Sequence, residues 1–305
     1  MGPTSIPPAV RNPNWQELPE ELTTSFLERV GSIYLIASGR KVCHSWRQIC
    51  SRPEMWRVVD LRISGYRSKW EILVNNMARK AVEWSCGQLI DFRLSYYGDN
   101  LLLNYISDRS SKLRCLHLEY CSNITNEGLI DMVKKLPLLE ELHIFGIPIS
   151  MQTIEVAGSS CLQLKSFKLN KSRYKCPHMG CDEHGLAIAE NMPGLRHLKL
   201  QGNKIATRGL LAILKNCVHL ESLDLRMCFL VEFESDEIRR LSPQIKDLWL
   251  PNDYTDDDEF DDQIYTCDTC DYTRPEFPSE SDIDSDELSG GSDIDSDYEL
   301  FVNDI

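Results

Sequence analysis

Large apolar residues recur along most of the chain in one short pattern. The pattern is Leu-x-x-Leu-x-Leu, in which Ile or Phe sometimes replaces Leu, and seven copies are present. They lie at residues 89–94, 113–118, 139–144, 164–169, 195–200, 220–225 and 245–250. The last positions of successive copies are 24, 26, 25, 31, 25 and 25 residues apart. A period of this length predicts stacked repeats, in which each unit packs against its neighbours.

Each repeat combines two hydrophobic periods. Alternating apolar positions inside a copy predict a short strand, with Leu116 and Leu118, for example, on the same face. Between copies the spacing becomes helical, as in residues 128–133 and 209–214. Strand–helix units with this period are typical of leucine-rich repeats (LRRs). We therefore predict an α/β solenoid whose parallel strands form one sheet on the inner side of an arc.

Cysteines follow the same repeat. Cys121 and Cys228 lie three positions beyond the last strand leucine, and Asn203 takes this place in the fifth copy. A polar side chain buried there satisfies backbone groups of the turn. Three more cysteines each lie three residues before the first leucine of a copy: Cys86, Cys161 and Cys217. The regular spacing predicts buried structural thiols in place of redox or metal-binding ones.

Negative charge is concentrated at the C-terminal end. The formal charge is −14, but residues 252–305 hold 20 acidic residues and one arginine, which leaves 27 acidic and 32 basic residues in the first 251. Low hydrophobicity with high charge predicts a disordered acidic tail over residues 252–305, and the proline-rich residues 1–13 are expected to be a disordered lead-in. No export signal and no apolar run of about 18 residues is found. We therefore expect an intracellular protein, in the nucleus, the cytoplasm or both, that does not associate with a membrane.

A different apolar spacing marks the stretch from Trp15 to Ile49. Large apolar residues recur there at intervals of three and four, which predicts short amphipathic helices. Pro19 suits the first turn of a helix, where its missing N–H costs nothing. About forty residues form a poor core alone, so we expect this segment to share its apolar surface with a partner. The alternative is a small helical cap that buries these side chains within the chain itself.

Particular residues give this segment a family resemblance. Leu18, Pro19 and Leu22 are followed by a Val-Cys-x-x-Trp run and then by Met55 and Trp56. Over residues 15–57 this order resembles an F-box, the module that binds the Skp-family adaptor of SCF ubiquitin ligases. The resemblance implies a set of residues that form the adaptor-facing apolar surface or brace it: Leu18, Pro19, Leu22, Val42, Cys43, Trp46 and Trp56.

The F-box resemblance and the repeats together imply a domain order. We expect residues 14–57 to form the F-box, 58–88 a bridge that caps the solenoid, and 89–251 about seven repeats. This combination resembles the plant F-box/LRR group of substrate-recognition subunits in SCF-type ubiquitin ligases. It implies that the F-box binds the adaptor, and through it cullin and RING subunits, while the arc binds a target protein for ubiquitination and proteasomal degradation.

Other functional classes are less favoured. A repeat scaffold without a ligase connection is the first alternative, and a small-molecule receptor is the second, because about seven repeats form a shallow arc without an enclosed pocket. No enzyme is expected, since the sequence holds no nucleophile elbow, P-loop, HExxH motif or paired-carboxylate constellation.

The concave face offers a candidate target-binding surface. Side chains alternate along a strand, so the residue between the two strand leucines points away from the core. These central positions are Arg93, His117, His143, Lys168, Lys199, Asp224 and Trp249. Five consecutive basic residues favour an acidic or phosphorylated partner, although a solvated face without a ligand is the simpler interpretation. Nucleic acid is not favoured, because the positive excess is small and no basic patch is interleaved with aromatic residues.

Two groups of metal-ligating residue types fall outside the repeat pattern. They are Cys176, His178, Cys181 and His184 within the 31-residue step, and Cys267 and Cys270 in the tail. Zinc sites usually show tighter paired spacing and a second pair, so an ordinary loop and tail are favoured over metal binding, and no cofactor is expected. One hypothesis for the acidic tail is that it lies against the basic concave residues and competes with the target.

Overall fold

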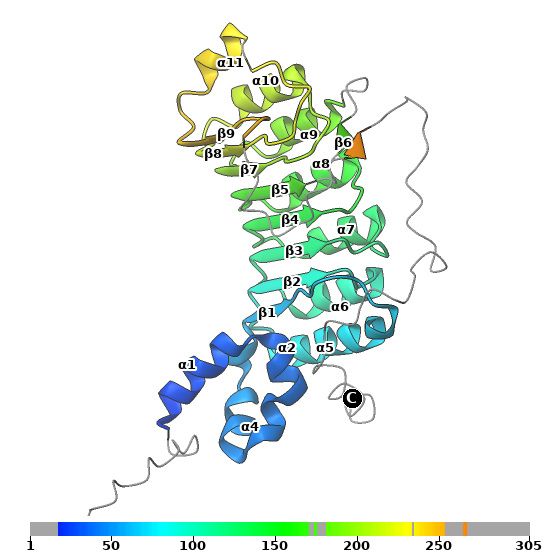
Figure 1. Cartoon of the computed structure of the whole chain (residues 1–305), viewed down its shortest axis with the longest axis vertical. Helices are drawn as coiled ribbons and strands as arrows, with labels where there is room; N and C mark the ends of the chain where they lie inside the picture. Colours follow the sequence, from blue (N-terminus) through cyan, green and yellow to red (C-terminus); the bar gives the residue numbers. More distant parts are fainter. Residues whose placement is uncertain (1–17, 171–173, 176–180, 234, 254–264, 267–305) are drawn as a thin grey trace, which may run out of the picture.

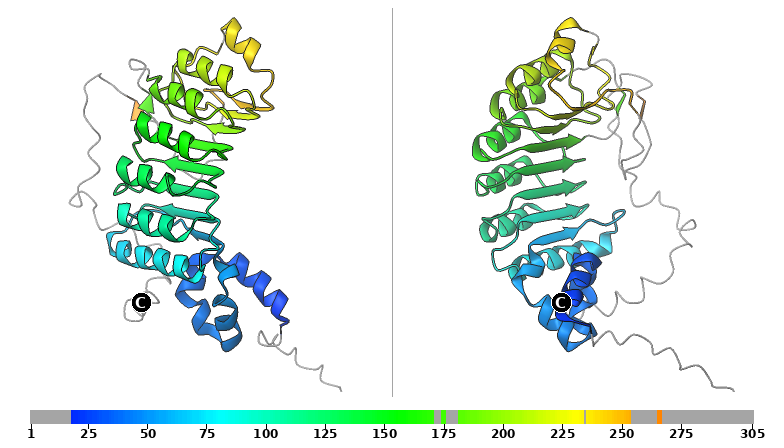
Figure 2. Two further views of the ribbon diagram at one scale, coloured as in Figure 1. Left: turned by 180° about the vertical axis from the view of Figure 1, so that it is seen from behind. Right: turned by 90° about the vertical axis from the view of Figure 1, so that its left-hand side faces the viewer.

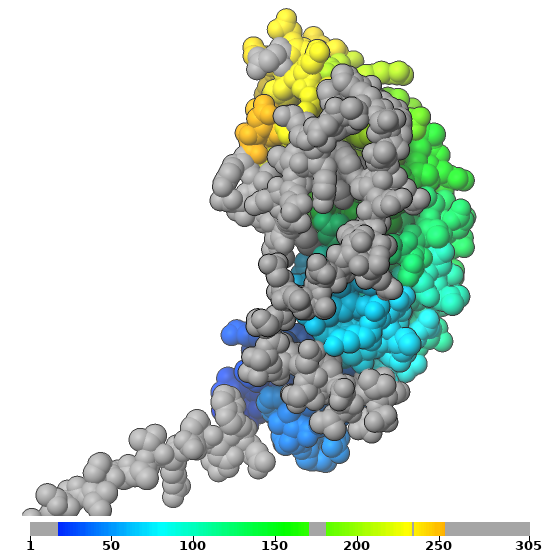
Figure 3. Space-filling view, turned by 45° about the vertical axis from the view of Figure 1, so that its right-hand side comes forward, coloured from blue at the N-terminus to red at the C-terminus, as the bar shows by residue number. Residues whose placement is uncertain are grey.

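The chain folds into a helical N-terminal module followed by a solenoid. The computed structural model describes residues 18–170, 174–175, 181–233, 235–253 and 265–266. The solenoid strands stack along the long axis of the molecule, and helices line one side of them (Figure 1). In the space-filling view the N-terminal module, in blue, lies at one end and the last described repeats, in yellow, lie at the other (Figure 3).

Short helical segments build the N-terminal module. They are α1 (Glu20–Val30), α2 (Ser32–Tyr34), the π-helix η2 (Leu35–Gly39), α3 (Arg40–Val42), α4 (His44–Cys50) and the 3-10 helix η3 (Pro53–Trp56). α1 begins directly after Pro19 and ends before Gly31, whose φ of 93° favours glycine. Leu27, Leu35 and Ile49 are buried where these segments meet.

Eight strands form one sheet in chain order. They are β1 (Val58–Leu61), β2 (Asp91–Ser95), β3 (Cys115–Glu119), β4 (Glu141–Phe145), β5 (Ser166–Asn170), β7 (His197–Lys199), β8 (Ser222–Asp224) and β9 (Asp247–Trp249). All neighbours pair in parallel, and the strands lie on the inner side of an arc (Figure 2). The predicted α/β solenoid is therefore confirmed. Outside this sheet, β6 (Tyr174–Lys175) pairs with β10 (Tyr265–Thr266).

Helices follow the strands on the outer side. They are the 3-10 helix η4 (Ser68–Trp70), α5 (Glu71–Trp84), α6 (Asn100–Arg109), α7 (Asn126–Val133), α8 (Met151–Ser160), α9 (Glu183–Asn191), α10 (Thr207–Asn216) and α11 (Asp236–Leu241). Hydrogen bonds join the N-termini of successive helices, as where the Asp182 carboxylate accepts the backbone N–H of Ala206 and of Gly209, each at 2.9 Å. A Cβ at Gly209 would lie 2.6 Å from that carboxylate, so the close approach requires glycine.

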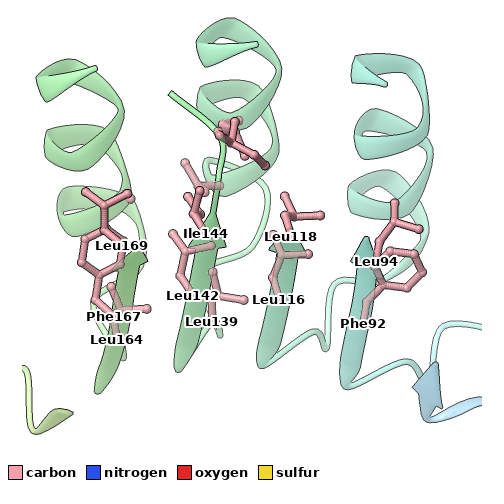
Figure 4. Close-up of a cluster of buried hydrophobic side chains, with 14 of the residues drawn as sticks. Phe92, Leu94, Leu116, Leu118, Leu139, Leu142, Ile144, Leu164, Phe167 and Leu169 are labelled. Atoms are coloured by element: carbon pink, nitrogen blue, oxygen red, sulfur yellow. The ribbon is translucent and has the colours of Figure 1, made fainter. Parts of the chain in front are cut away.

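The core lies between the sheet and the helices. The strand leucines point from the strands toward the helices and stack on their counterparts in the next repeat (Figure 4). Phe92, Leu94, Leu116 and Leu118 have no exposed surface. Each repeat thus covers the apolar side of its neighbour, and the sheet register follows the leucine pattern.

The sheet begins one strand earlier than the seven copies predict. β1 pairs with β2 so that Leu61 lies opposite Leu94. By the same register, Trp56 takes the position that Leu89 takes in the next repeat, and both side chains are fully buried. Trp56 therefore ends the N-terminal module and also begins the solenoid. A tryptophan in the first leucine position and a longer step to the next strand hide this copy in the sequence.

The repeat cysteines are buried, with one exception. The Sγ of Cys228 lies 2.9 Å from the Leu200 carbonyl, and burial raises the pKa of this thiol and of Cys121 to about 12. Cys161 and Cys217 are also buried, as predicted. The prediction for Cys86 is wrong, because that side chain is exposed. Ser85, which directly follows α5, is fully buried instead of Cys86.

Candidate functional site

An uncovered apolar face runs along the N-terminal module. Its members are Leu18, Leu22, Phe26 and Val42, with 38%, 58%, 41% and 57% of their surface exposed. Leu22 and Phe26 are four residues apart on α1, so they share one side of that helix. The alternative of a cap that buries its own apolar residues is therefore wrong for Leu22 and Val42. Several large exposed apolar side chains on one small module are typical of a protein-binding surface.

Three further residues of the predicted adaptor-facing set shape the ends of the helices beside this face. Pro19 is exposed directly before α1. The half-buried Trp46 ring lies 5.8 Å, centroid to centroid, from the ring of Phe26. Cys43 caps α4, because its Sγ accepts the backbone N–H of Trp46 at 3.5 Å. Leu18, Cys43 and Trp46 also line one pocket, so the structure brings these three residues together beside Phe26.

Trp56 is the member of the predicted set that lies away from the face. Its side chain is fully buried, and its Nε1–H donates to the Cys50 carbonyl at 2.9 Å. Its ring packs against that of Trp84 on α5, with the centroids 4.9 Å apart. The role that this geometry supports is bracing, since Trp56 joins the end of α4 to the first repeat.

Polar contacts also join the N-terminal module to the first strand of the solenoid. The Ser32 hydroxyl, on α2, donates to the Val58 carbonyl at 3.4 Å and accepts the Asp60 N–H at 3.0 Å, both on β1. The Arg40 guanidinium lies 4.5 Å from the ring centroid of Trp84. The N-terminal module and the solenoid are therefore packed as one unit and not merely tethered.

The seven predicted concave residues lie in one row across the sheet. Strand pairing places each directly beside the next, from β2 to β9: Arg93, His117, His143, Lys168, Lys199, Asp224 and Trp249. Asp60 on β1 extends the row by one position. The pattern of alternation thus places these residues correctly, but it does not determine which of them are charged.

The two histidines in this row form a stacked pair. The ring centroids of His117 and His143 are 3.9 Å apart, and 10% and 14% of the two side chains are exposed. Burial is the largest cause that lowers both pKa values below the ordinary range, and the nearby positive charges of Arg93 and Lys168 lower them further. Both imidazoles are therefore neutral at neutral pH. The positive charge of the row comes from Arg93, Lys168 and Lys199.

Carboxylates balance part of this charge. Arg93 forms an ion pair with Asp91 at 2.7 Å, and Lys199 approaches Asp224 at 3.5 Å. Asp224 is also paired with Arg226 at 2.6 Å. Burial, followed by the charge of Lys199, lowers the pKa of Lys168. The positive character of the concave face is thus local and centred on Lys168 and Lys199.

Comparison with known proteins places this geometry in a family. The F-box-like family model matches residues 15–62, and a leucine-rich repeat model matches residues 109–133 and 192–214. The F-box protein SKIP19 of Arabidopsis thaliana is 44% identical over 257 residues, which cover 83% of each chain. The chain belongs to the F-box/LRR-repeat family. We therefore call the N-terminal module the F-box and the exposed face of Leu18, Leu22, Phe26 and Val42 the F-box face.

Other relatives in Arabidopsis thaliana carry both parts of the family name. The putative F-box/LRR-repeat protein 9 is 41% identical over 248 residues, with 77% of this chain and 97% of that protein covered. The putative F-box/LRR-repeat protein 23 is 43% identical over 244 residues, with 80% and 54% covered. Among solved structures, the tropomodulin C-terminal domain of Caenorhabditis elegans aligns with 48% of this chain at 12% identity and a TM-score of 0.37, too weak a likeness to show a shared fold.

The buried histidine pair predicts a loss of stability in mild acid. Below about pH 6.5 the unfolded chain takes up protons on both imidazoles, whereas His117 stays neutral in the native protein down to about pH 4. The free energy of unfolding should therefore fall by about 2 to 4 kcal/mol between pH 7 and pH 5 through this pair. Urea denaturation at both pH values measures the loss. The double variant His117→Asn, His143→Asn should lose less, and an equal loss in both proteins would contradict the prediction.

Sequence patterns missed two features, one in the concave row and one beside the F-box. Glu141 precedes His143 by two residues, so it shares the face of the histidine pair. Near the F-box, Tyr96 stacks on Tyr120 with centroids 5.3 Å apart, and both line a cleft of about 660 Å³ together with Arg62 and residues of α1 and α2. The alternation of strand residues could have identified Glu141, whereas nothing in the repeat pattern locates a cleft between two modules.

The two groups of metal-ligating residue types, for which an ordinary loop and tail were predicted, lie mostly outside the described residues, which do not include Cys176, His178, Cys267 or Cys270. His184 is on α9, where its Nε2 lies 3.0 Å from the Ile149 carbonyl and therefore acts as a donor. Cys181 is partly buried before that helix. Within the described part of the chain, no helix has the length and apolar character needed to cross a membrane.

Proposed function

We propose that this F-box/LRR protein is the substrate-recognition subunit of an SCF-type ubiquitin ligase. The F-box face carries the proposal, because Leu22 and Val42 each leave more than half of a large apolar side chain in water. Covering such surface contributes about 25 cal/mol for each Å² buried. A Skp-family adaptor would cover it, as the F-box membership suggests, and would bring cullin and RING subunits with it.

Ubiquitin transfer would then follow from proximity. The adaptor, cullin and RING subunits would position a ubiquitin-charged conjugating enzyme, and the arc would hold the target beside it. Holding both reactants in one assembly raises their effective concentration, so this chain needs no catalytic group of its own. Degradation of the target by the proteasome would occur in the nucleus, the cytoplasm or both.

A fixed angle between the two binding surfaces supports this mechanism. Ser32 and Trp56 pack the F-box directly onto the first repeat, so the arc holds a set orientation relative to the adaptor. A flexible tether would supply proximity but not orientation. Such a junction would let a receptor present its target in one direction.

The concave face is the proposed target surface. Lys168 and Lys199 lie side by side at its centre, on β5 and β7. Two neighbouring ammonium groups favour a partner with acidic or phosphorylated side chains. The acidic tail is the proposed intramolecular competitor for the same residues.

Reversing these two charges should weaken target binding. Replacing Lys168 and Lys199 by Glu is expected to lower the affinity for an acidic target by about tenfold or more, because hydrogen bonds to charged groups contribute about 1.5–3 kcal/mol each. Binding to the purified target, at low and at physiological salt, measures the change. The matched control replaces the exposed Lys112 and Lys134 by Glu and should leave the affinity unchanged. Unchanged binding in the concave variant would remove these residues from the target surface.

Proximity labelling tests the proposed function as a whole. The full chain, fused to a labelling enzyme, is expressed with and without proteasome inhibition, beside a variant with Leu22→Asp and Val42→Asp. We expect the wild type to label adaptor, cullin and targets that accumulate under inhibition, and the variant to label targets without the ligase subunits. A scaffold would label the same proteins in both chains, and none would respond to inhibition. Binding of a purified target without any added small molecule would exclude the receptor alternative.

A further inference from the structure

Three metal-ligating side chains meet on the floor of the concave face. Glu141 and His143 are two residues apart on β4, and His117 lies opposite His143 on β3. The Glu141 carboxylate is 3.8 Å from the Nε2 of His143 and 4.0 Å from the Nε2 of His117. One donor atom from each residue can be chosen so that all three lie within 4.8 Å of one another. Small side-chain rotations would therefore bring all three donor atoms within bonding distance of one metal ion placed between them.

A buried nitrogen without a partner marks the same point. The Nε2 of His117 is inaccessible to solvent and has no hydrogen-bond partner within the described part of the chain. Only 8% of the residue is exposed. A buried polar atom that lacks a partner costs about 1–3 kcal/mol, so its retention calls for an explanation. The other histidine differs, because the Nε2 of His143 also lies 3.3 Å from the Ser166 hydroxyl.

The charges of these three side chains suit the binding of a cation. Neutral imidazole is the form that coordinates metals, and burial keeps both rings neutral. Glu141 supplies a negative charge at the same point, and Asp91 supplies another nearby, where it is paired with Arg93. Lys168 opposes a cation by its own charge. The charges of the carboxylates and of the positive side chains thus offset one another. The residue types of the three ligands therefore decide which metal ion is preferred.

We propose that His117, Glu141 and His143 form a zinc-class divalent metal site on the concave face. Two imidazoles and one carboxylate are typical of zinc sites that leave the fourth position open. All three side chains project from the concave side of the sheet, so the open position would lie on that side, next to the half-exposed Glu141 carboxylate. A carboxylate, imidazole or thiolate of the bound target would be suited to take it. That last step rests on the proposed function of the arc, whereas the metal site does not.

The site is tested by metal binding to the full chain alone. Cys176, Cys181, Cys267 and Cys270 are first replaced by Ser, so that these groups contribute no competing thiolate. The chain is then stripped with a chelator and titrated with Co²⁺ as a spectroscopic substitute for zinc. We expect one equivalent to bind with visible absorption bands of low coordination number. Zinc added afterwards should displace the Co²⁺, remove the bands and raise the unfolding temperature.

Conservative variants decide the location. Glu141→Gln and His143→Gln should each weaken Co²⁺ binding by more than about tenfold, while His197→Gln, at an exposed position on β7, should not. Circular dichroism checks that each variant is folded. The proposal would be overturned by a lack of stoichiometric binding in the parent chain, or by equal affinity in all three variants. Neither result depends on adaptor or ubiquitin, so failure of this site and failure of the ligase function are distinguishable.

Discussion

Replacing Leu22 and Val42 by Asp is expected to lower the affinity of the chain for a Skp-family adaptor by more than about a hundredfold. Each side chain is more than half exposed in the free chain and would be buried in the complex. Full burial of a Leu or Val contributes about 1.5–3 kcal/mol, and an aspartate in the same place adds the cost of removing a charge from water. Calorimetric titration of the purified full chain with adaptor measures the change.

Two apolar residues of the solenoid that are at least as exposed provide the control. Val218 is 57% exposed, as Val42 is, and Leu162 is 85% exposed. Replacing both by Asp adds two negative charges and removes exposed apolar surface, as the Leu22→Asp, Val42→Asp variant does. The changes lie away from the F-box face. We expect adaptor affinity to stay within about twofold of the wild type, since surface substitutions change free energies by about 0.5 kcal/mol or less. A loss as large as that of the F-box variant would contradict the assignment of the face.

Replacing Trp56 by Ala should cost about 3–5 kcal/mol of stability, which is the range for a large aromatic core residue. The substitution removes the contact with Trp84 and the hydrogen bond to Cys50 at the junction of the two parts. Because this residue also begins the first repeat, we expect the F-box to unfold separately from the remaining arc. Urea denaturation followed by circular dichroism measures both the loss and the second transition.

Trp249 provides the comparison for this substitution. It lies at the opposite end of the sheet, on β9, and is 38% exposed. Trp249→Ala should lower the free energy of unfolding much less than Trp56→Ala does. It should also produce no separate unfolding transition of the F-box. If the two substitutions were equally costly, the role of Trp56 in joining the modules would be wrong.

Repeat spacing predicted most of the fold. The leucine period determines strand order and register, because a copy that shifted by one residue would turn its leucines away from the core. The period did not predict the first strand, β1. Trp56 takes the place of a leucine there, and the helical segment before β2 makes the step to the next copy longer. The period also failed at Cys86, since the residue that is buried after α5 is Ser85. Local helix ends decide such single positions, and the period does not encode them.

The two candidate surfaces were predictable to different degrees. Motif residues predicted Leu18, Leu22 and Val42 of the F-box face but not Phe26, and alternation predicted the concave row, because both follow from one helix or strand at a time. The ionisation of His117 depends on burial against His143 from another repeat, so composition suggested a positive charge that the folded protein does not hold. Glu141 became a candidate only once β3 and β4 were paired. Contacts between repeats are thus the part that one-dimensional patterns omit.

Transfer of ubiquitin to a captured target tests the central claim most directly. A target found by proximity labelling is incubated with this chain, adaptor, cullin, RING, conjugating enzyme and ubiquitin. We predict ubiquitin conjugation that is lost without this chain, lost with Leu22→Asp and Val42→Asp, and reduced with Lys168→Glu and Lys199→Glu. Equal conjugation without the chain, or none while adaptor and target are both shown to bind it, would contradict a role as substrate receptor.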